Sequence, residues 1–259
     1  MVVTEFEVFR IERRDSVAVV WMNRPEKKNA MSPVFFRELP VVLDTLGRDN
    51  DMRAVVLTGA GDAFSAGGDI ASFGELHDIP AYRRHLRLVF DAFHSIERAE
   101  LPVIAAVNGV AYGGGTEIIL ACDIVIASER ATFAFREATV GLQPGYGLVR
   151  GPDVIGRHWT RWLALTADII DAQKALQIGL VQAVVPHEQL LEEALAIAGR
   201  IAANPAIAVQ VGKQFVNRDT GGRGLAETLE ATALLFTTDD QKEGVAAFLE
   251  RRPPSFEGH

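Results

Sequence analysis

The stretch Val107–Asp123, VNGVAYGGGTEIILACD, decides how the rest of the chain is interpreted. An apolar run over residues 102–107 predicts a strand, which ends at the turn signal Asn108-Gly109. Three consecutive glycines follow at 113–115, and an apolar segment with helical spacing comes after them. Glycine lets the main chain approach a ligand closely, and the free N–H groups at a helix start favour negative charge there. The stretch therefore predicts a strand, a glycine turn and a helix start that together can contact a ligand.

A carboxylate lies inside this otherwise apolar segment. Glu117 follows Gly114 by three residues. In one interpretation it is an ordinary first-turn glutamate that the helix dipole stabilises. In the other it is a functional group beside the glycine turn. The segment by itself does not choose between the two.

A second stretch of the same kind lies upstream. The predicted strand Arg53–Leu57 is followed by a turn over 58–62, and then by Ala63–Ile70, AFSAGGDI, with Asp69 near a predicted helix start. Two separate sources of backbone N–H groups, each beside small residues, can converge on one oxygen. This is how an oxyanion hole is built from main chain.

Composition limits the classes of protein that fit. The chain has 259 residues, of which 48% are hydrophobic and 23% are charged, as expected for a globular enzyme. The net charge of −8 argues against nucleic acid and against an anionic membrane surface as partners. It leaves room for a local basic pocket that binds a phosphate-bearing ligand. No run of 18 apolar residues is present, so no membrane span is expected.

The single cysteine and the first residues bear on location. Cys122 cannot form an intrachain disulfide, which is compatible with a reducing compartment. The N-terminal residues lack the apolar core of a secretory signal, and we expect them to form the first strand. The expected location is therefore the cytoplasm. The six histidines show no zinc-ligand spacing, so no metal site is expected.

The order of elements predicts an α/β protein. Predicted strands alternate with helices up to about residue 185, and the chain is helical in pattern from His187 on. A hairpin is expected from Glu5–Arg10 and Val17–Met22, and the glycine-rich stretch Gly141–Gly151 is expected to turn at Pro144-Gly145. The clearest expected helices are Val34–Arg48, Ala81–Arg98, Glu188–Ala203, Ala206–Asn217, Leu225–Thr237 and Asp240–Glu250.

AFSAGGDI together with VNGVAYGGGTEIILACDIVIAS resembles the enoyl-CoA hydratase/isomerase (crotonase) family. Further blocks that fit the family follow in order along nearly the whole chain: Asn23-Arg-Pro, Asn29-Ala30, Ala131-Thr-Phe, Ile170–Ala175 and Asp240–Arg252. The resemblance implies an α/β fold in which strand–strand–helix units coil into a crotonase-like spiral over residues 1–186. It also implies a C-terminal helical region, 187–259, that builds a homotrimer, often paired into a hexamer.

The same resemblance implies an activity and its residues. Glu117 and Glu137 occupy the positions of the paired catalytic glutamates of enoyl-CoA hydratases, and retention of both favours hydration of a 2-enoyl-CoA over isomerisation. The N–H groups of Ala66 and Gly114 are expected to form the oxyanion hole, and the backbone of Gly145 to hold the water. Which glutamate is the acid and which the base stays open. Coenzyme A belongs to the substrate and no separate cofactor is expected. The residues expected to contact the substrate are Lys28, Ala30, Asp69, Ile70 and Tyr146.

Several alternatives stay open beside this interpretation. Glu137 taken alone is more commonly a surface residue, here paired with Arg136. The segment from Tyr146 to Pro152 is one residue shorter than in hydratases of the family. A phenol beside the water site narrows the acyl pocket or adds a hydrogen bond there, so the acyl group is left open. Other crotonase-type reactions (isomerase, lyase, thioester hydrolase) and a non-catalytic CoA-ester-binding member are the alternatives. For the CoA phosphates, the candidate cations are Lys27, Lys28, Arg251 and Arg252.

Overall fold

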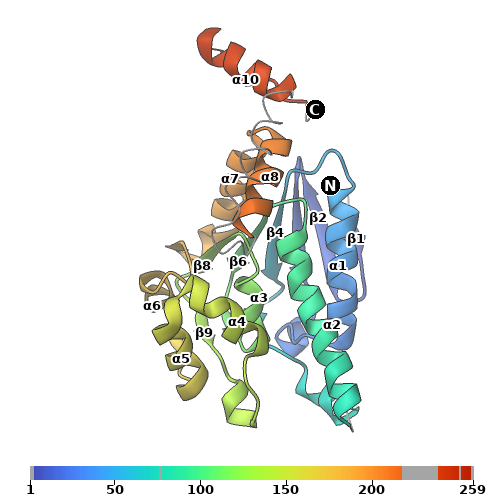
Figure 1. Cartoon of the computed structure of the whole chain (residues 1–259), viewed down its shortest axis with the longest axis vertical. Coiled ribbons are helices and arrows are strands. Elements are labelled where there is room, and N and C mark those ends of the chain that lie inside the picture. The colour runs from blue at the N-terminus through green and yellow to red at the C-terminus, as the bar shows by residue number, and fades with distance from the viewer. Residues whose placement is uncertain (1–2, 76–77, 218–238, 251, 258–259) are drawn as a thin grey trace.

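A seven-stranded sheet is the central element of the computed structural model, which describes residues 3–75, 78–217, 239–250 and 252–257 (Figure 1). The first three strands pair antiparallel and the remaining four pair parallel. Parallel neighbours require a crossover, and helices on the faces of the sheet provide it. In spatial order the strands are β1 (Val3–Glu5), β2 (Phe9–Arg14), β3 (Val17–Met22), β4 (Ala54–Gly59), β6 (Val103–Val107), β8 (Ile124–Ser128) and β11 (Ala183–Val185).

A second, four-stranded sheet is built from short strands that each follow a strand of the first. The chain passes from β4 into β5, from β6 into β7, and from β8 into β9. In spatial order this sheet contains β10 (Ile170–Asp171), β9 (Thr132–Ala134), β7 (Val110–Tyr112) and β5 (Ala63–Ser65). The repeated passage from one sheet to the other, followed by a helix, is the expected spiral of strand–strand–helix units.

Helices pack on the sheets, and two of the longest have side-chain caps. Ser32 caps the helix α1 by accepting a hydrogen bond from the N–H of Phe35 at 3.4 Å, and Asp78 caps α2 through the N–H of Ala81 at 2.6 Å. The α-helices are α1 (Pro33–Gly47), α2 (Ile79–Arg98), α3 (Gly114–Ile119), α4 (Gly145–Val154), α5 (Gly156–Thr166), α6 (Ala172–Gln177), α7 (Leu190–Ala202), α8 (Ala206–Val216) and α10 (Asp239–Glu250). The 3-10 helices are η1 (Pro25–Lys27), η2 (Ile70–Glu75), η3 (Glu137–Val140) and η4 (His187–Gln189).

Both faces of the large sheet are buried. Along β3, Ala18 and Val20 belong to the core on the side of α1 and α2, whereas Val17 and Val19 belong to the core on the other side. The second core is closed by residues of α7. This double burial explains why the strands are continuous apolar runs without alternation. Because α7 lies beyond residue 186, the first long helix of the expected oligomerisation region also covers the sheet. The proposed division at residue 186 stays a prediction.

Two predicted elements have different bounds in the structure. The first hairpin strand is β2, Phe9–Arg14, rather than Glu5–Arg10, because a tight turn at Asp15, with φ of 52°, pairs Arg14 with Val17. The glycine-rich stretch Gly141–Gly151 has its turn at Gly141 rather than at Pro144-Gly145, and α4 begins at Gly145. Its helical state comes from the burial of its first turn, which the glycine content concealed. The predicted helix Leu225–Thr237 lies outside the described residues.

No single helix among the described residues is long and apolar enough to cross a membrane. The pair η4–α7 and α8 passes that test only jointly, across a bend of 108°. Figure 1 shows α10 beyond α7 and α8, at the end of the molecule away from the sheets.

Candidate active site

Glu117 lies in the first turn of α3, after the glycine turn, and faces the start of α4. The turn before α3 is made by Gly113, whose φ of 51° favours glycine, and Glu117 follows in the first turn of the helix. The Glu117 side chain is buried, and its Oε1 accepts a hydrogen bond of 2.8 Å from the N–H of Gly147 in the first turn of α4. The contact with α4 was not expected from the sequence, because 30 residues separate the two groups.

Glu137 approaches the same turn from η3. A Cβ added to Gly113 would lie 2.8 Å from Glu137 Oε1, so the carboxyl group packs directly against this glycine. Glu137 Oε2 is buried and has no hydrogen-bond partner in the described structure. Arg136, the partner in the alternative interpretation, instead donates from Nη1 to the carbonyl of Ala167 at 2.9 Å. The structure therefore places Glu137 beside Glu117 and leaves one of its oxygens available to a ligand.

The two carboxyl groups influence each other's ionisation. Burial and, as a smaller cause, the nearby Glu137 charge raise the pKa of Glu117 to about 8, while the N–H groups of Gly147 and Tyr146 oppose the shift. Burial also raises the pKa of Glu137. Because two carboxylates in one buried site resist double ionisation, the pair retains a proton near neutral pH. A pair in this state contains one acid and one base.

One expected oxyanion donor is wrong. The N–H of Ala66 donates to the carbonyl of Lys28 at 2.9 Å, so it is already used within the fold. The contact forms because the loop after η1 runs beside the loop after β5. Sequence reasoning had no signal for this pairing, since 38 residues separate the two.

The N–H of Gly68 is the alternative candidate for this donor. The N–H of Met31 donates to Gly67 O at 2.8 Å and the N–H of Asp69 donates to Met31 O at 2.9 Å, which leaves the N–H of Gly68 between them without a partner in the described structure. A Cβ added to Gly114 would lie 3.7 Å from Gly68 N. Gly114 is the first residue of α3, so its N–H has no partner in the helix. Two unpaired N–H groups therefore lie close together beside the carboxyl pair.

Four of the expected substrate contacts lie along two adjoining loops. Arg24 joins the loops, because its Nη1 donates to Ala30 O at 2.8 Å and to Asp69 Oδ2 at 3.1 Å. Lys28 is exposed, and the side chain of Ile70 is 61% exposed. The two loops flank the N–H group of Gly68, and contact of these residues with a substrate stays a prediction.

Tyr146 is not part of that surface. Its side chain is only 3% exposed, and its hydroxyl donates to Glu97 Oε1 on α2 at 2.6 Å. The hydroxyl does not donate to the water site, as one of the two expectations required, because helix α2 provides a charged acceptor for it. A role of the Tyr146 ring in narrowing the acyl pocket stays a prediction. At the tail, Arg252 donates to Glu243 and Glu250, so this candidate phosphate ligand is already paired, and Arg251 lies outside the described residues.

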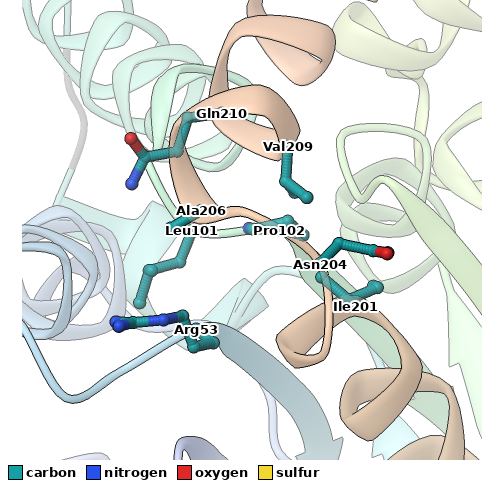
Figure 2. A pocket seen from close by; sticks show the side chains of 8 residues that line it. All are labelled: Arg53, Leu101, Pro102, Ile201, Asn204, Ala206, Val209 and Gln210. Atoms are coloured by element: carbon teal, nitrogen blue, oxygen red, sulfur yellow. The ribbon is translucent and has the colours of Figure 1, made fainter. Parts of the chain in front are cut away.

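A hollow on the opposite edge of the sheet does not share these features. It lies where β4 and β6 begin, whereas the glycine turns follow the strands' other ends (Figure 2). The hollow holds about 230 Å³ including open solvent. Its lining residues are Arg53, Leu101, Pro102, Ile201, Asn204, Ala206, Val209 and Gln210. The described residues contain no group of three or more His, Cys, Asp or Glu placed to hold a metal ion.

Comparison with known proteins identifies the family. The family described as Enoyl-CoA hydratase/isomerase matches residues 12–259. The chain is 40% identical over 250 residues to the short-chain-enoyl-CoA hydratase of Clostridium acetobutylicum, covering 93% of this chain and 94% of that one. It is 38% identical over 256 residues to the crotonyl-CoA hydratase of Syntrophomonas wolfei, covering 97% and 98%.

Solved structures agree with this assignment. An enoyl-CoA hydratase from Bacillus anthracis superposes with a TM-score of 0.93 at 34% identity, covering 98% of this chain and 100% of that one. The chain belongs to the enoyl-CoA hydratase/isomerase (crotonase) family. It is an enzyme of that family and has its fold.

Proposed function

We propose that this enzyme is an enoyl-CoA hydratase that adds water reversibly across the C2=C3 double bond of a 2-enoyl-CoA thioester. The observation that carries the proposal is the unpartnered, buried Oε2 of Glu137 beside the Glu117 carboxyl group and two unpaired N–H groups. Addition of water to a conjugated thioester needs a base, an acid and a site for negative charge, and this arrangement contains all three. The relatives named as hydratases, at 38–40% identity, support the same activity.

The N–H groups of Gly68 and Gly114 are proposed as the oxyanion hole. The thioester carbonyl oxygen binds between them, and the negative charge that develops on it is stabilised. One such donor is typically worth about 3–4 kcal/mol of transition-state stabilisation. Withdrawal of electrons toward this oxygen makes C3 of the enoyl group electrophilic.

Glu117 and Glu137 then move the protons. A water molecule held by the pair loses a proton to the ionised carboxylate as its oxygen bonds to C3. The protonated carboxyl delivers its proton to C2, so the pair holds one proton before and after the reaction. The raised pKa of Glu117, about 8, supports a pair that retains a proton at neutral pH. The product is a 3-hydroxyacyl-CoA, and no cofactor beyond the substrate's own coenzyme A takes part.

The surrounding residues have proposed supporting roles. Gly145, the first residue of α4, is proposed to help hold the water through its backbone. The loop residues Lys28, Ala30, Asp69 and Ile70 are proposed to contact the substrate. Their place beside Gly68 supports this, because the CoA portion must pass the oxyanion hole to deliver the thioester.

A homotrimer, or a hexamer of two trimers, is proposed as the assembly. Large apolar side chains lie exposed on α4, α5 and α8, among them Val149, Trp162, Leu165 and Val216. The helix α10 lies away from the sheets, where a neighbouring subunit would cover it. The proposed location is the cytoplasm. Analytical ultracentrifugation tests the assembly, and a monomer at micromolar concentration would contradict it.

The activity is tested with purified protein and two substrates, crotonyl-CoA and a longer 2-enoyl-CoA. Loss of the conjugated-thioester absorbance, with formation of 3-hydroxyacyl-CoA by mass spectrometry, is expected. Release of free CoA from a saturated acyl-CoA would instead indicate a thioester hydrolase. Co-crystals with acetoacetyl-CoA test the oxyanion hole, and the thioester oxygen is expected within hydrogen-bond distance of Gly68 N and Gly114 N. An oxygen bound at Ala66 N would contradict the assignment.

A further inference from the structure

A buried polar cluster joins α2 to α4 behind the active site. Glu97 Oε1 accepts hydrogen bonds from the Tyr146 hydroxyl at 2.6 Å and from Arg150 Nε at 2.7 Å. Glu97 Oε2 accepts from Arg150 Nη2 at 2.7 Å. The Glu97 side chain is only 12% exposed, so the cluster is largely shielded from solvent. Charge-assisted, bidentate hydrogen bonds of this kind are strong and directional.

Aromatic packing fixes the same part of α4. The Tyr146 ring makes an edge contact with Phe93 at 5.3 Å between ring centroids, and another with His94 at 5.6 Å. Both partners lie on α2, as does Glu97. The first turn of α4 is therefore attached to α2 by ring packing and by the hydroxyl group at once.

The first turn of α4 has little local reason to be helical. It begins Gly145-Tyr146-Gly147, and the preceding Pro144 provides no side-chain cap. Glycine disfavours helix by about 1 kcal/mol relative to alanine at each position. Contacts with other elements must therefore hold this turn, and Tyr146 and Arg150 make the polar contacts to α2.

This turn is also the one that binds Glu117. The N–H of Gly147 donates to Glu117 Oε1 at 2.8 Å, and Gly147 is bonded directly to Tyr146. We propose that Glu97, Tyr146 and Arg150 form a positioning unit, here called the α2–α4 clamp, that keeps the first turn of α4 against the Glu117 carboxyl group. The proposal deepens the proposed function and its effect on turnover rests on it.

The clamp has a consequence for proton transfer. N–H groups stabilise the ionised form of Glu117, and the charge of Glu137 opposes it. The charged and titratable groups that face Glu97 are Arg150, Tyr146 and His94, whose Nε2 lies 3.8 Å from Glu97 Oε2. Loosening the clamp moves the N–H of Gly147 away from the Glu117 carboxyl group, so this group is less well positioned and titrates at a higher pH.

The experiment compares Tyr146→Phe and Glu97→Gln with the wild-type enzyme. Phenylalanine keeps the ring packing and removes only the hydroxyl, so Tyr146→Phe is expected to fold. With crotonyl-CoA we expect kcat to fall roughly tenfold while KM changes less than about twofold, because positioning is lost and binding is not. Arg150→Lys is expected to retain more kcat than Arg150→Met. Arg13→Met, which removes an ion pair with Asp49 remote from the site, serves as the control.

A direct measurement of Glu117 separates this proposal from the proposed activity. Protein labelled with ¹³C at glutamate carboxyls is titrated by NMR, with Glu117→Gln used to assign the signal. We expect the Glu117 titration to move to higher pH in Tyr146→Phe and Glu97→Gln and to stay in place in Arg13→Met. An unmoved titration together with wild-type kcat would overturn the clamp. If the wild-type enzyme fails to hydrate either substrate, the proposed activity fails, and the titration alone then decides for or against the clamp.

Discussion

The two edges of the central sheet differ in whether their buried polar groups have hydrogen-bond partners. At the edge where β4 and β6 begin, Lys213 Nζ is paired with Asp123 Oδ2 at 2.8 Å and donates to the carbonyls of Ile96 and Leu101 at 2.9 Å each. At the edge reached through β5 and β7, Glu137 Oε2 has no partner in the described structure.

This difference separates stability from function. A buried polar group without a partner destabilises the fold, so it is retained where a ligand supplies the missing hydrogen bond. At the Lys213 edge the buried polar groups are hydrogen-bonded to other residues of the protein, and these bonds attach α8 to the sheet. The glutamate edge leaves groups unsatisfied and is suited to binding. Substitutions at the glutamate edge are therefore expected to lower activity and spare stability. Substitutions at the Lys213 edge are expected to lower stability and spare activity.

The largest effect is expected from the carboxyl pair. Glu117→Gln and Glu137→Gln should each lower kcat with crotonyl-CoA by about 10²–10⁴-fold, because each removes a proton-transfer group. Thermal stability should not fall. Steady-state kinetics and a binding titration with acetoacetyl-CoA check this, with Glu129→Gln on an exposed turn as the control. Retention of a tenth of the rate in either variant would contradict the paired roles.

The next effect is expected at the opposite edge. Lys213→Met should lower the free energy of unfolding by about 3 kcal/mol, because it leaves the partly buried Asp123 carboxylate without its cation and the carbonyls of Ile96 and Leu101 without their donor. The folded protein should keep kcat within about twofold. Denaturant titration measures the loss, and adding Asp123→Asn should recover part of it. Arg48→Met, in an exposed ion pair with Asp44, should cost less than about 1 kcal/mol. If Lys213→Met lowered kcat by more than its loss of folded protein explains, the Lys213 edge would also serve activity, and the contrast between the two edges would be wrong.

The glycine turn gives a third test. In Gly113→Ala the new methyl group lies 2.8 Å from Glu137 Oε1 and the backbone keeps a φ of 51°, so kcat should fall about 10²-fold. Gly156→Ala is the matched control, because its φ is 74° but nothing lies within 4 Å of the added atom. Both variants should lose about 1–2 kcal/mol of stability from backbone strain. Equal activities in the two variants would show that the contact with Glu137 does not matter.

The smallest expected effect is the contribution of Glu117 to the pH dependence of stability. Glu117 has a pKa of about 8 in the folded protein against an ordinary value of 4.5, so the folded state binds a proton that the unfolded state releases between these values. Wild-type stability should therefore fall as pH rises through this window, and Glu117→Gln removes that fall. From about pH 5.5 to 7 the variant should gain about 2 kcal/mol relative to wild type. Calorimetry at both pH values checks the gain, and a constant difference would mean that Glu117 is not shifted.

Much of the fold followed from local pattern. The helices α1 and α2 were predictable because both carry apolar stripes of helical period, and the two glycine stretches were predictable from their place after apolar strands. The pairing of Glu117 with Glu137 was expected only through family resemblance, since 20 residues separate them.

The rest was not predictable, because it depends on contacts between distant segments. Ala66 and Gly68 are both small and lie in the same loop, and only the hydrogen bonds to Lys28 and Met31 show which N–H group stays unpaired. The direction of the Tyr146 hydroxyl likewise depends on where α2 places Glu97.

The sequence by itself determined the class of fold, the two glycine turns and the identity of the two carboxyl residues. These follow from periodicity, from glycine's access to positive φ and from recognisable blocks, all of which are properties of short segments. Only the tertiary structure decided which N–H groups are left unpaired, which carboxyl oxygen lacks a partner and what holds α4 in place. Each of these is a question of hydrogen-bond partners, and a partner is found only when the chain has brought distant residues together.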